Sequence, residues 1–195
     1  MGRPRQHDEK VAEALLDAAE SRVAAEGVDS LSLRAVAAGA DTTTRAVYTL
    51  FGSKDALVGA LGVRAMRLLE AEALTMTPTA DPAADLVEAG LGFRRFALGR
   101  PALFSVAFHR ASAKAWPPFR EVSVDTFSHL QQRFEPLAAQ GLLGDRTIPE
   151  AALQFDALCE GLAWVELRGN RLTPDPETFW RRSIAALVAG FLQAA

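Results

Sequence analysis

The chain has 195 residues, of which 49% are apolar, with a formal net charge of −3 and a mean hydropathy of +0.07. No apolar run reaches the roughly eighteen residues of a membrane-spanning helix, and the N-terminus lacks the apolar core of a signal peptide. Because Cys159 is the single cysteine, an intrachain disulfide and a zinc cluster built on thiols are excluded. We therefore expect a cytoplasmic protein without a membrane span, metal or cofactor.

The distribution of charge does not by itself indicate a nucleic-acid partner. Residues 1–60 contain seven basic and nine acidic side chains, so this segment has a formal charge of −2. A DNA-binding segment with this composition must gather its basic side chains on one face, with the acidic ones elsewhere.

Helical patterns dominate the chain from its beginning, and no convincing alternating run indicates a strand. Ser32 and Thr43 stand where they can cap two short helices, and Gly27 and Gly52 stand where helices commonly end. In chain order, the first four predicted helices cover residues 8–26, 33–38, 44–50 and 54–74.

Residues 75–82 contain two prolines and form the clearest break in the chain. Beyond it, prolines and glycines separate further helical segments. These predicted helices cover residues 83–100, 102–113, 119–140, 150–170 and 176–194.

The pattern predicts an all-α protein of about nine helices with short loops. We expect an N-terminal head with a helix-turn-helix over residues 1–53 and a C-terminal helical bundle over residues 54–195. The helix over 54–74 would connect the two.

The two short helices over 33–38 and 44–50 are joined by a short turn, which is the layout of a helix-turn-helix. Helices this short are not stable alone in water, so the flanking helices must hold them in place. The outer face of 44–50 would then be free to enter the major groove of B-DNA. The side chains expected to be buried in this arrangement are Leu33, Val36, Ala37, Val47 and Phe51.

Three runs of residues stand out in this region by their order and spacing: Gly2-Arg3-Pro4-Arg5, Ala46-Val47-Tyr48 and Phe51-Gly52-Ser53-Lys54-Asp55-Ala56-Leu57. With them the region resembles TetR-type (TetR/AcrR family) transcriptional regulators, and the likeness covers about residues 2–60. A further run, Phe96-Ala-Leu-Gly-Arg-Pro-Ala-Leu-Phe104, which continues to His109, is similar to the start of the sensing domain in one subgroup, and this likeness is weaker.

Two positions depart from the family pattern. Asp41 stands where a glycine is usual in the turn, and aspartate tolerates a positive φ better than most residues do. Thr42 stands where an apolar residue is usual, and its hydroxyl needs a hydrogen-bond partner. The turn remains feasible with both residues.

The helix over 44–50 carries the expected DNA contacts, and Thr43 lies at its N-terminus. Thr44 can donate to a phosphate or touch a thymine methyl, and Arg45 can read a guanine through its two-pronged guanidinium. A phosphate contact without sequence information is an equal alternative for Arg45. The resemblance implies that Tyr48 bonds a phosphate, and Thr49 is expected to do the same. A Tyr48 ring packed against the first helix is the alternative.

Four further basic residues complete the expected interface. Lys54 opens a helix whose free N–H groups already favour an anion, so a phosphate clamp is expected there. Arg34 could reach the DNA backbone from the preceding helix. Arg3 and Arg5 could enter the minor groove from a flexible arm, or simply form a solubilising tail.

The last two predicted helices carry apolar side chains at helical spacing. In the resembled family this pair meets its two-fold mate in a four-helix bundle, and a symmetric pair suits two related DNA half-sites. A core within one chain is the alternative, and both can hold in part. The expected interface residues are Phe155, Leu158, Leu162, Ile184, Leu187, Val188 and Phe191.

The middle helices are rich in aromatic side chains, which fill cores about twice as often as they line cavities. The resembled family usually keeps an apolar pocket here, so a small effector is expected among them, oriented by a few polar groups. The candidate ligand-binding residues are Phe93, Phe96, Phe104, Phe108, His109, Trp116, Phe127, Glu160 and Trp164.

These features together indicate a ligand-responsive transcriptional regulator, expected to be a repressor. It would bind a palindromic operator in double-stranded DNA as a homodimer, and a small apolar or aromatic effector would release it. No catalytic residues are expected, because the chain has no nucleophile elbow, phosphate-binding glycine loop or metal-ligand cluster. The alternative is a helical partner- or ligand-binding protein of the same fold without DNA-binding activity, which the acidic head leaves open.

Overall fold

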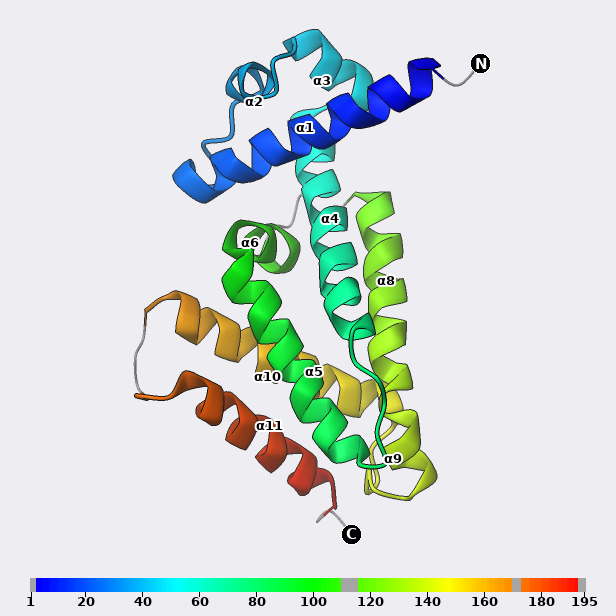
Figure 1. Cartoon of the computed structure of the whole chain (residues 1–195). Coiled ribbons are helices and arrows are strands. Elements are labelled where there is room, and N and C mark those ends of the chain that lie inside the picture. The colour runs from blue at the N-terminus through cyan, green and yellow to red at the C-terminus, as the bar shows by residue number, and fades with distance from the viewer. Residues whose placement is uncertain (1–2, 110–115, 170–172, 193–195) are drawn as a thin grey trace. The chain divides into compact units, whose positions relative to one another are not determined.

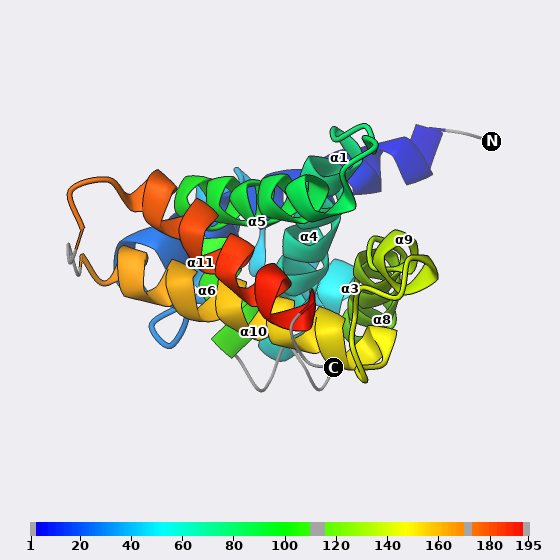
Figure 2. The same ribbon diagram turned by 90° about the horizontal axis from the view of Figure 1, so that it is seen from below.

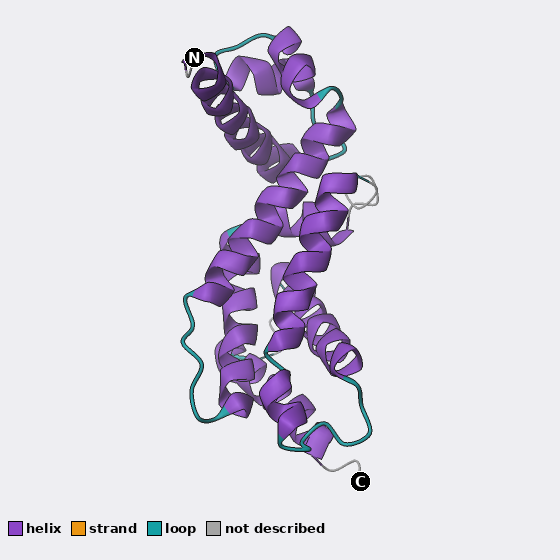
Figure 3. Cartoon of the chain, turned by 90° about the vertical axis from the view of Figure 1, so that its right-hand side faces the viewer, coloured by secondary structure: helices purple, strands orange, loops and turns teal. Residues whose placement is uncertain are grey.

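The structure, a computed structural model, describes residues 3–109, 116–169 and 173–192 (Figure 1). Within these ranges the backbone forms helices, turns and loops, and no strand (Figure 3). The all-α prediction is therefore confirmed. None of the helices in the described part of the chain is both long and apolar enough to cross a membrane.

The first three helices are α1 (Arg3–Glu26), α2 (Leu33–Gly39) and α3 (Thr44–Phe51). Their order and their ends agree with the sequence signals, except at the N-terminus. There α1 begins at Arg3, five residues earlier than expected, so the backbone at Arg3 and Arg5 is helical and not a flexible arm. The side chains of residues 1–7 lie outside the described part.

The caps of the two short helices are those that the sequence predicts. The backbone N–H of Ala46 donates to Oγ1 of Thr43 at 3.2 Å, and Ser32 caps α2 in the same way. Gly52 ends α3 with a φ of 79°, and its N–H donates to the carbonyl oxygen of Tyr48. Such side-chain caps satisfy N–H groups that a short helix leaves without partners.

Seven further helices follow within the described residues, and most of them begin at or beside a proline, whose fixed φ suits the first turn of a helix. They are α4 (Lys54–Leu74), α5 (Pro82–Gly99), α6 (Pro101–His109), α8 (Pro117–Gln132), α9 (Glu135–Ala139), α10 (Ile148–Leu167) and α11 (Pro176–Leu192).

The prediction of a single helix over 119–140 is wrong, because the helix is interrupted between α8 and α9. Arg133 and Phe134 form a turn in which each N–H donates to a carbonyl three residues back. Pro136 follows in the first turn of α9. A proline inside a continuous helix would remove one hydrogen bond and clash with the preceding turn, so the helix stops and restarts.

The chain packs as two compact units. One consists of Met1–Met66 with Arg100–Ser123, and the other of Arg67–Gly99 with Val124–Ala195. The first unit therefore contains more than the expected head, because α6 and the beginning of α8 pack with it. The expected division at residues 53 and 54 remains a prediction about function.

In the first unit, α1 packs against α2, α3 and α6. Two glycines of α4 seat aromatic rings: a Cβ on Gly59 would lie 2.5 Å from the Trp116 ring, and one on Gly62 would lie 2.6 Å from the Phe119 ring. Only glycine allows these rings to lie directly on the helix backbone. Side chains that are fully covered in this unit include Leu15, Ala19, Val36, Val47, Leu57, Leu61, Leu103 and Phe104.

In the second unit, α5 packs against α10 and α11, which also contact each other (Figure 2). Glu166 on α10 accepts two hydrogen bonds from Arg94 on α5, at 2.6 and 2.9 Å, and one from the Trp180 indole at 3.0 Å. These hydrogen bonds raise the pKa of the Arg94 guanidinium. Glu166 thus joins three helices, because both of its carboxylate oxygens accept hydrogen bonds from other helices.

Burial raises the pKa of the Cys159 thiol in the same core.

Candidate nucleic-acid interface

Helix α3 turns one side inward and the other toward solvent. Val47 is fully covered, whereas Arg45 and Thr49 are exposed and Tyr48 keeps 54% of its surface exposed. Tyr48 is therefore not buried against α1, and about half of its surface is left for a ligand. Thr44, at the first position of the helix, is half-buried.

Two threonines of this region already form hydrogen bonds with the backbone of α3. Oγ1 of Thr43 accepts the capping hydrogen bond, which leaves its O–H free to donate. The Thr49 hydroxyl donates to the carbonyl oxygen of Arg45 at 2.9 Å. Because a phosphate oxygen only accepts, Thr49 must give up this bond before it can donate to DNA. Thr43 is thus the better placed of the two as a phosphate donor.

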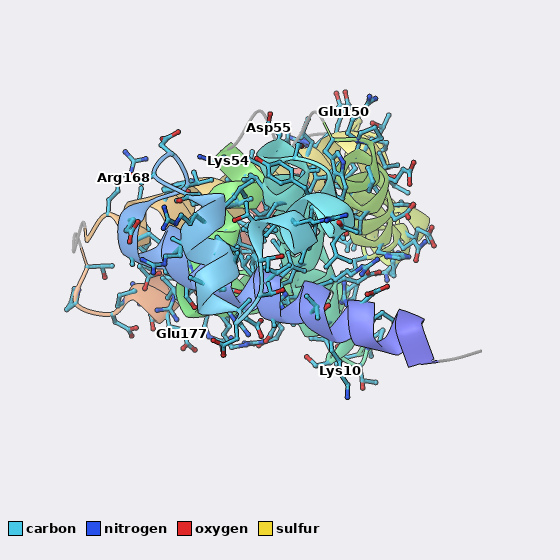
Figure 4. All side chains as sticks on the ribbon, turned by 90° about the horizontal axis from the view of Figure 1, so that it is seen from above. Lys10, Lys54, Asp55, Glu150, Arg168 and Glu177 are labelled. Atoms are coloured by element: carbon cyan, nitrogen blue, oxygen red, sulfur yellow. The ribbon has the colours of Figure 1, made fainter. Side chains whose placement is uncertain are left out.

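Lys54 and Asp55, labelled in Figure 4, are the first two residues of α4, and Gly52 and Ser53 separate them from the end of α3. The Lys54 ammonium donates to the carbonyl oxygen of Asp29 at 3.2 Å, which ties α4 to the loop between α1 and α2. An ammonium has three N–H groups, so two remain for an anion. Ser53 caps the helix by accepting from the N–H of Ala56 at 3.0 Å.

Arg34 lies on the exposed side of α2. It is one of five described cations of the first unit that do not pair with a carboxylate in any described salt bridge, the others being Lys10, Arg45, Lys54 and Arg120. Sequence reasoning singled out Arg34, Arg45 and Lys54.

Three of the six acidic side chains of α1 form salt bridges with two arginines, Arg64 on α4 and Arg100 directly before α6. Arg64 on α4 bridges Glu13 at 2.6 Å, Asp17 at 2.7 Å and Glu20 at 3.4 Å. Arg100 bridges Glu20 at 2.8 Å. Burial lowers the pKa of the Arg64 guanidinium, but hydrogen bonds to Asp17 and Glu13 outweigh it and raise the pKa above its usual value. Sequence reasoning missed this network, although three carboxylates spaced four and three residues apart share one helix face.

The predicted ligand-binding residues divide between the two units. Phe104, Phe108 and Trp116 belong to the first, and the Phe104 and Phe108 rings stack in a tilted pair at 5.0 Å. Phe104 is fully covered. The side chain of His109 lies outside the described part. The members in the second unit are Phe93, Phe96, Phe127, Glu160 and Trp164.

In the second unit, Phe93 and Phe96 are buried in the core, whereas Phe127, Glu160 and Trp164 are half-buried. Phe93 and Phe96 have 6% and 4% of their surface exposed, so they act first as core residues. No described feature assigns an effector to either group, and the ligand-binding set remains a prediction.

The predicted dimer residues also divide, but by burial. Phe155, Ile184, Val188 and Phe191 have at most 3% of their surface exposed within a single chain. Within one chain they lie in the core, as the alternative of an intramolecular core allows, and their part in a dimer interface stays a prediction. Leu158, Leu162 and Leu187 are half-buried and keep some surface.

Three exposed apolar residues on the same two helices escaped the sequence reasoning. Leu153 and Val165 on α10 are 59% and 39% exposed, and Phe179 on α11 is 46% exposed. The spacing of apolar residues identified the helix pair but could not tell its inner side from its outer side, because both sides are apolar. The described residues contain no group of three or more His, Cys, Asp or Glu that could hold a metal.

Two family models match the chain, and together they define a bacterial transcriptional regulator. Residues 15–61 match bacterial regulatory proteins of the tetR family, and residues 86–187 match the tetracyclin repressor-like C-terminal domain. The chain belongs to the TetR family, whose members are transcriptional regulators and not enzymes.

Solved structures show the same fold. A protein of unknown function from Rhodococcus sp. RHA1 superimposes with a TM-score of 0.78 at 22% identity, covering 94% of this chain and 96% of that one. The fatty acid degradation regulator FadR from Bacillus halodurans gives 0.77 at 15% identity, covering 94% and 97%. The TetR family regulator PfmR from Thermus thermophilus gives 0.67 at 15% identity, covering 90% and 97%. No curated protein matches the chain.

Proposed function

We propose that this protein is a ligand-responsive transcriptional repressor that binds a palindromic operator in double-stranded DNA as a homodimer. A small apolar or aromatic effector releases it, and it acts in the cytoplasm. The observation that carries the proposal is the capped α3 helix, which exposes Arg45 and Tyr48 within the segment that matches the family model.

The proposed contacts follow from the donors that the structure leaves available. Arg45 reads a guanine with its guanidinium, and Tyr48 donates its hydroxyl to a phosphate. Lys54 binds a second phosphate with its two remaining N–H groups, beside the N-terminus of α4. Thr43 and Thr44 lie at the N-terminus of α3, the end that enters the major groove in this proposal. Arg34 reaches the backbone from α2.

The proposed dimer forms through the outer sides of α10 and α11. Leu153, Val165 and Phe179 supply exposed apolar surface there, and Leu158 and Leu162 keep part of theirs. A two-fold pairing presents the same residues twice and places two recognition helices on two half-sites.

Selection of bound duplexes from a random pool tests the function directly. Wild-type protein should enrich a palindrome, and its affinity should fall steeply with salt because phosphate contacts release counterions. Absence of any salt-sensitive DNA binding would instead favour a helical partner-binding protein without DNA-binding activity, as the net acidic head allows.

Two variants distinguish base reading from phosphate binding. Arg45→Ala should cost about 1–3 kcal/mol of operator binding and relax one base position, whereas Lys54→Ala should weaken all sequences alike and reduce the salt slope by roughly one. Arg22→Ala is the matched control, because the described salt bridge of Arg22 joins it to Glu26 on its own helix. Fluorescence anisotropy titrations at several salt concentrations measure both effects. Wild-type behaviour of both variants would contradict the contact assignment.

A further inference from the structure

The ion pairs around Glu20 connect the head to two other helices of the first unit. Glu20 lies on α1 with only 14% of its side chain exposed, and it receives Arg64 from α4 and Arg100 from the start of α6. Arg64, itself 18% exposed, reaches two further carboxylates of α1, Glu13 and Asp17. A single guanidinium thus contacts three carboxylates over two turns of α1.

Most surface ion pairs stabilise a protein little, because water screens them and long side chains lose freedom. Arg64 and Glu20 differ from such pairs, since both are mostly covered and each has more than one partner of opposite charge, so that they belong to a network. Arg22 with Glu26 is the ordinary case: both are about half exposed, and the pair joins positions on one helix.

The position of α1 matters for α3, because α1 packs directly against α2 and α3. A change in the position of α1 would therefore shift α3, the proposed recognition helix. Helix α4 continues without a break to Leu74, into the second unit, and α6 follows directly on α5. Arg64 lies just before the unit boundary at Met66, and Arg100 directly follows the boundary at Gly99. The two arginines therefore tie α1 to two points where the chain passes between the units.

We propose that Arg64 is a positioning residue for operator recognition, which, together with Arg100, fixes α1 and hence α3 against α4 and so sets the half-site spacing that the dimer accepts. The inference rests on the proposed function. A dimeric helix-turn-helix protein reads half-sites about 34–36 Å apart, and a duplex lengthened by one base pair changes both the separation and the rotation of its half-sites. A loosely held head tolerates this change, whereas a firmly held one does not.

The test compares the selected operator with two duplexes whose centre is one base pair longer or shorter. Affinities of the full chain are measured by fluorescence anisotropy for wild type, Arg64→Met, Arg64→Lys and the control Arg22→Met. Wild type and the control should bind the altered duplexes at least roughly tenfold more weakly than the operator, and for Arg64→Met this ratio should fall to about threefold or less. Arg64→Lys should recover part of the discrimination, because lysine keeps the charge but reaches fewer carboxylates.

The ratio of the affinities for the operator and for the altered duplexes distinguishes a positioning role of Arg64 from a role in stability alone. A merely structural role would lower the affinity of Arg64→Met for every duplex by the same factor, and that result would overturn the inference, as would an unchanged ratio. If Arg64→Met fails to fold, the pair Glu13→Gln with Asp17→Asn removes two exposed contacts of Arg64 and should lower the ratio in the same direction. Failure of the wild type to bind any duplex would overturn the proposed function itself, a result distinct from an unchanged ratio.

Discussion

Asp41 shows the cost of one residue placed where the family usually has glycine. Its φ of 48° lies in the left-handed region, and among the described residues it is the one non-glycine residue with a positive φ. The turn must bend this sharply because α2 ends at Gly39 and α3 begins at Thr44. Aspartate accepts the conformation better than most residues, since its short polar side chain bonds locally.

Substitution of Asp41 tests this backbone requirement. Asp41→Val should lower the free energy of unfolding by about 1–2 kcal/mol, because a β-branched residue is strained in the left-handed region. Asp41→Gly removes the strain and should leave the free energy at or above the wild-type value. Urea unfolding followed by circular dichroism measures both, and equal stability of the valine and glycine variants would contradict the interpretation.

Individual residues were predictable from the sequence where their partners are close along the chain. Thr43 caps α3 through Ala46, three residues away, and such local bonds follow from residue type and spacing. Lys54 was expected to face phosphate alone, but its bond to Asp29 spans 25 residues, which no local pattern reveals. The Arg64 contacts are missed for the same reason.

At the scale of helices, the packing of α4 requires small residues in addition to apolar ones. Gly59 and Gly62 let Trp116 and Phe119 lie on its backbone. The boundaries of α4 were predicted correctly from a serine cap and the polar segment that follows. The aromatic seats were not, because the sequence does not show which distant ring lies on a given glycine.

Gly59→Ala should lower the free energy of unfolding by about 1–3 kcal/mol, because the new methyl would overlap a packed ring. Its Cβ would lie 2.7 Å from Cδ2 and 2.9 Å from Cβ of Trp116, so the ring cannot simply swing away. Gly92→Ala on α5 is the matched control: its Cβ would meet Arg95 Nη2 at 3.5 Å, an ordinary contact, and helix propensity should raise stability by roughly 0.5–1 kcal/mol. Thermal and urea unfolding would contradict the packing argument if both variants changed stability alike.

For the whole molecule, the fold class and the helix order were predictable because hydrophobic periodicity and prolines are distributed over the entire chain. The assignment of apolar surface was harder. Ile184 and Phe191 were expected at an interface, with a core within one chain as the alternative, and in a single chain they lie in the core of the second unit. Periodicity reports that a face is apolar, but only packing decides whether the same chain or a second copy covers it.

Leu153→Arg tests the proposed interface. Because Leu153 is 59% exposed, the substitution should change the stability of the folded chain by less than about 0.5 kcal/mol, while a charge buried without a partner should dissociate the dimer. Sedimentation velocity should then show monomers. Val124→Arg on α8, which is 68% exposed, is the control and should remain dimeric. A dimer of unchanged strength in Leu153→Arg would place the interface elsewhere.

The burial of Cys159 has a practical consequence for studying motion in this protein. Thiol reagents react with the thiolate, and a thiol that is covered and reluctant to ionise reacts slowly with maleimides and oxidants. Since the sequence contains no second cysteine, a cysteine introduced on the exposed side of α3 would carry a spin label or fluorophore selectively, with the native thiol left in place.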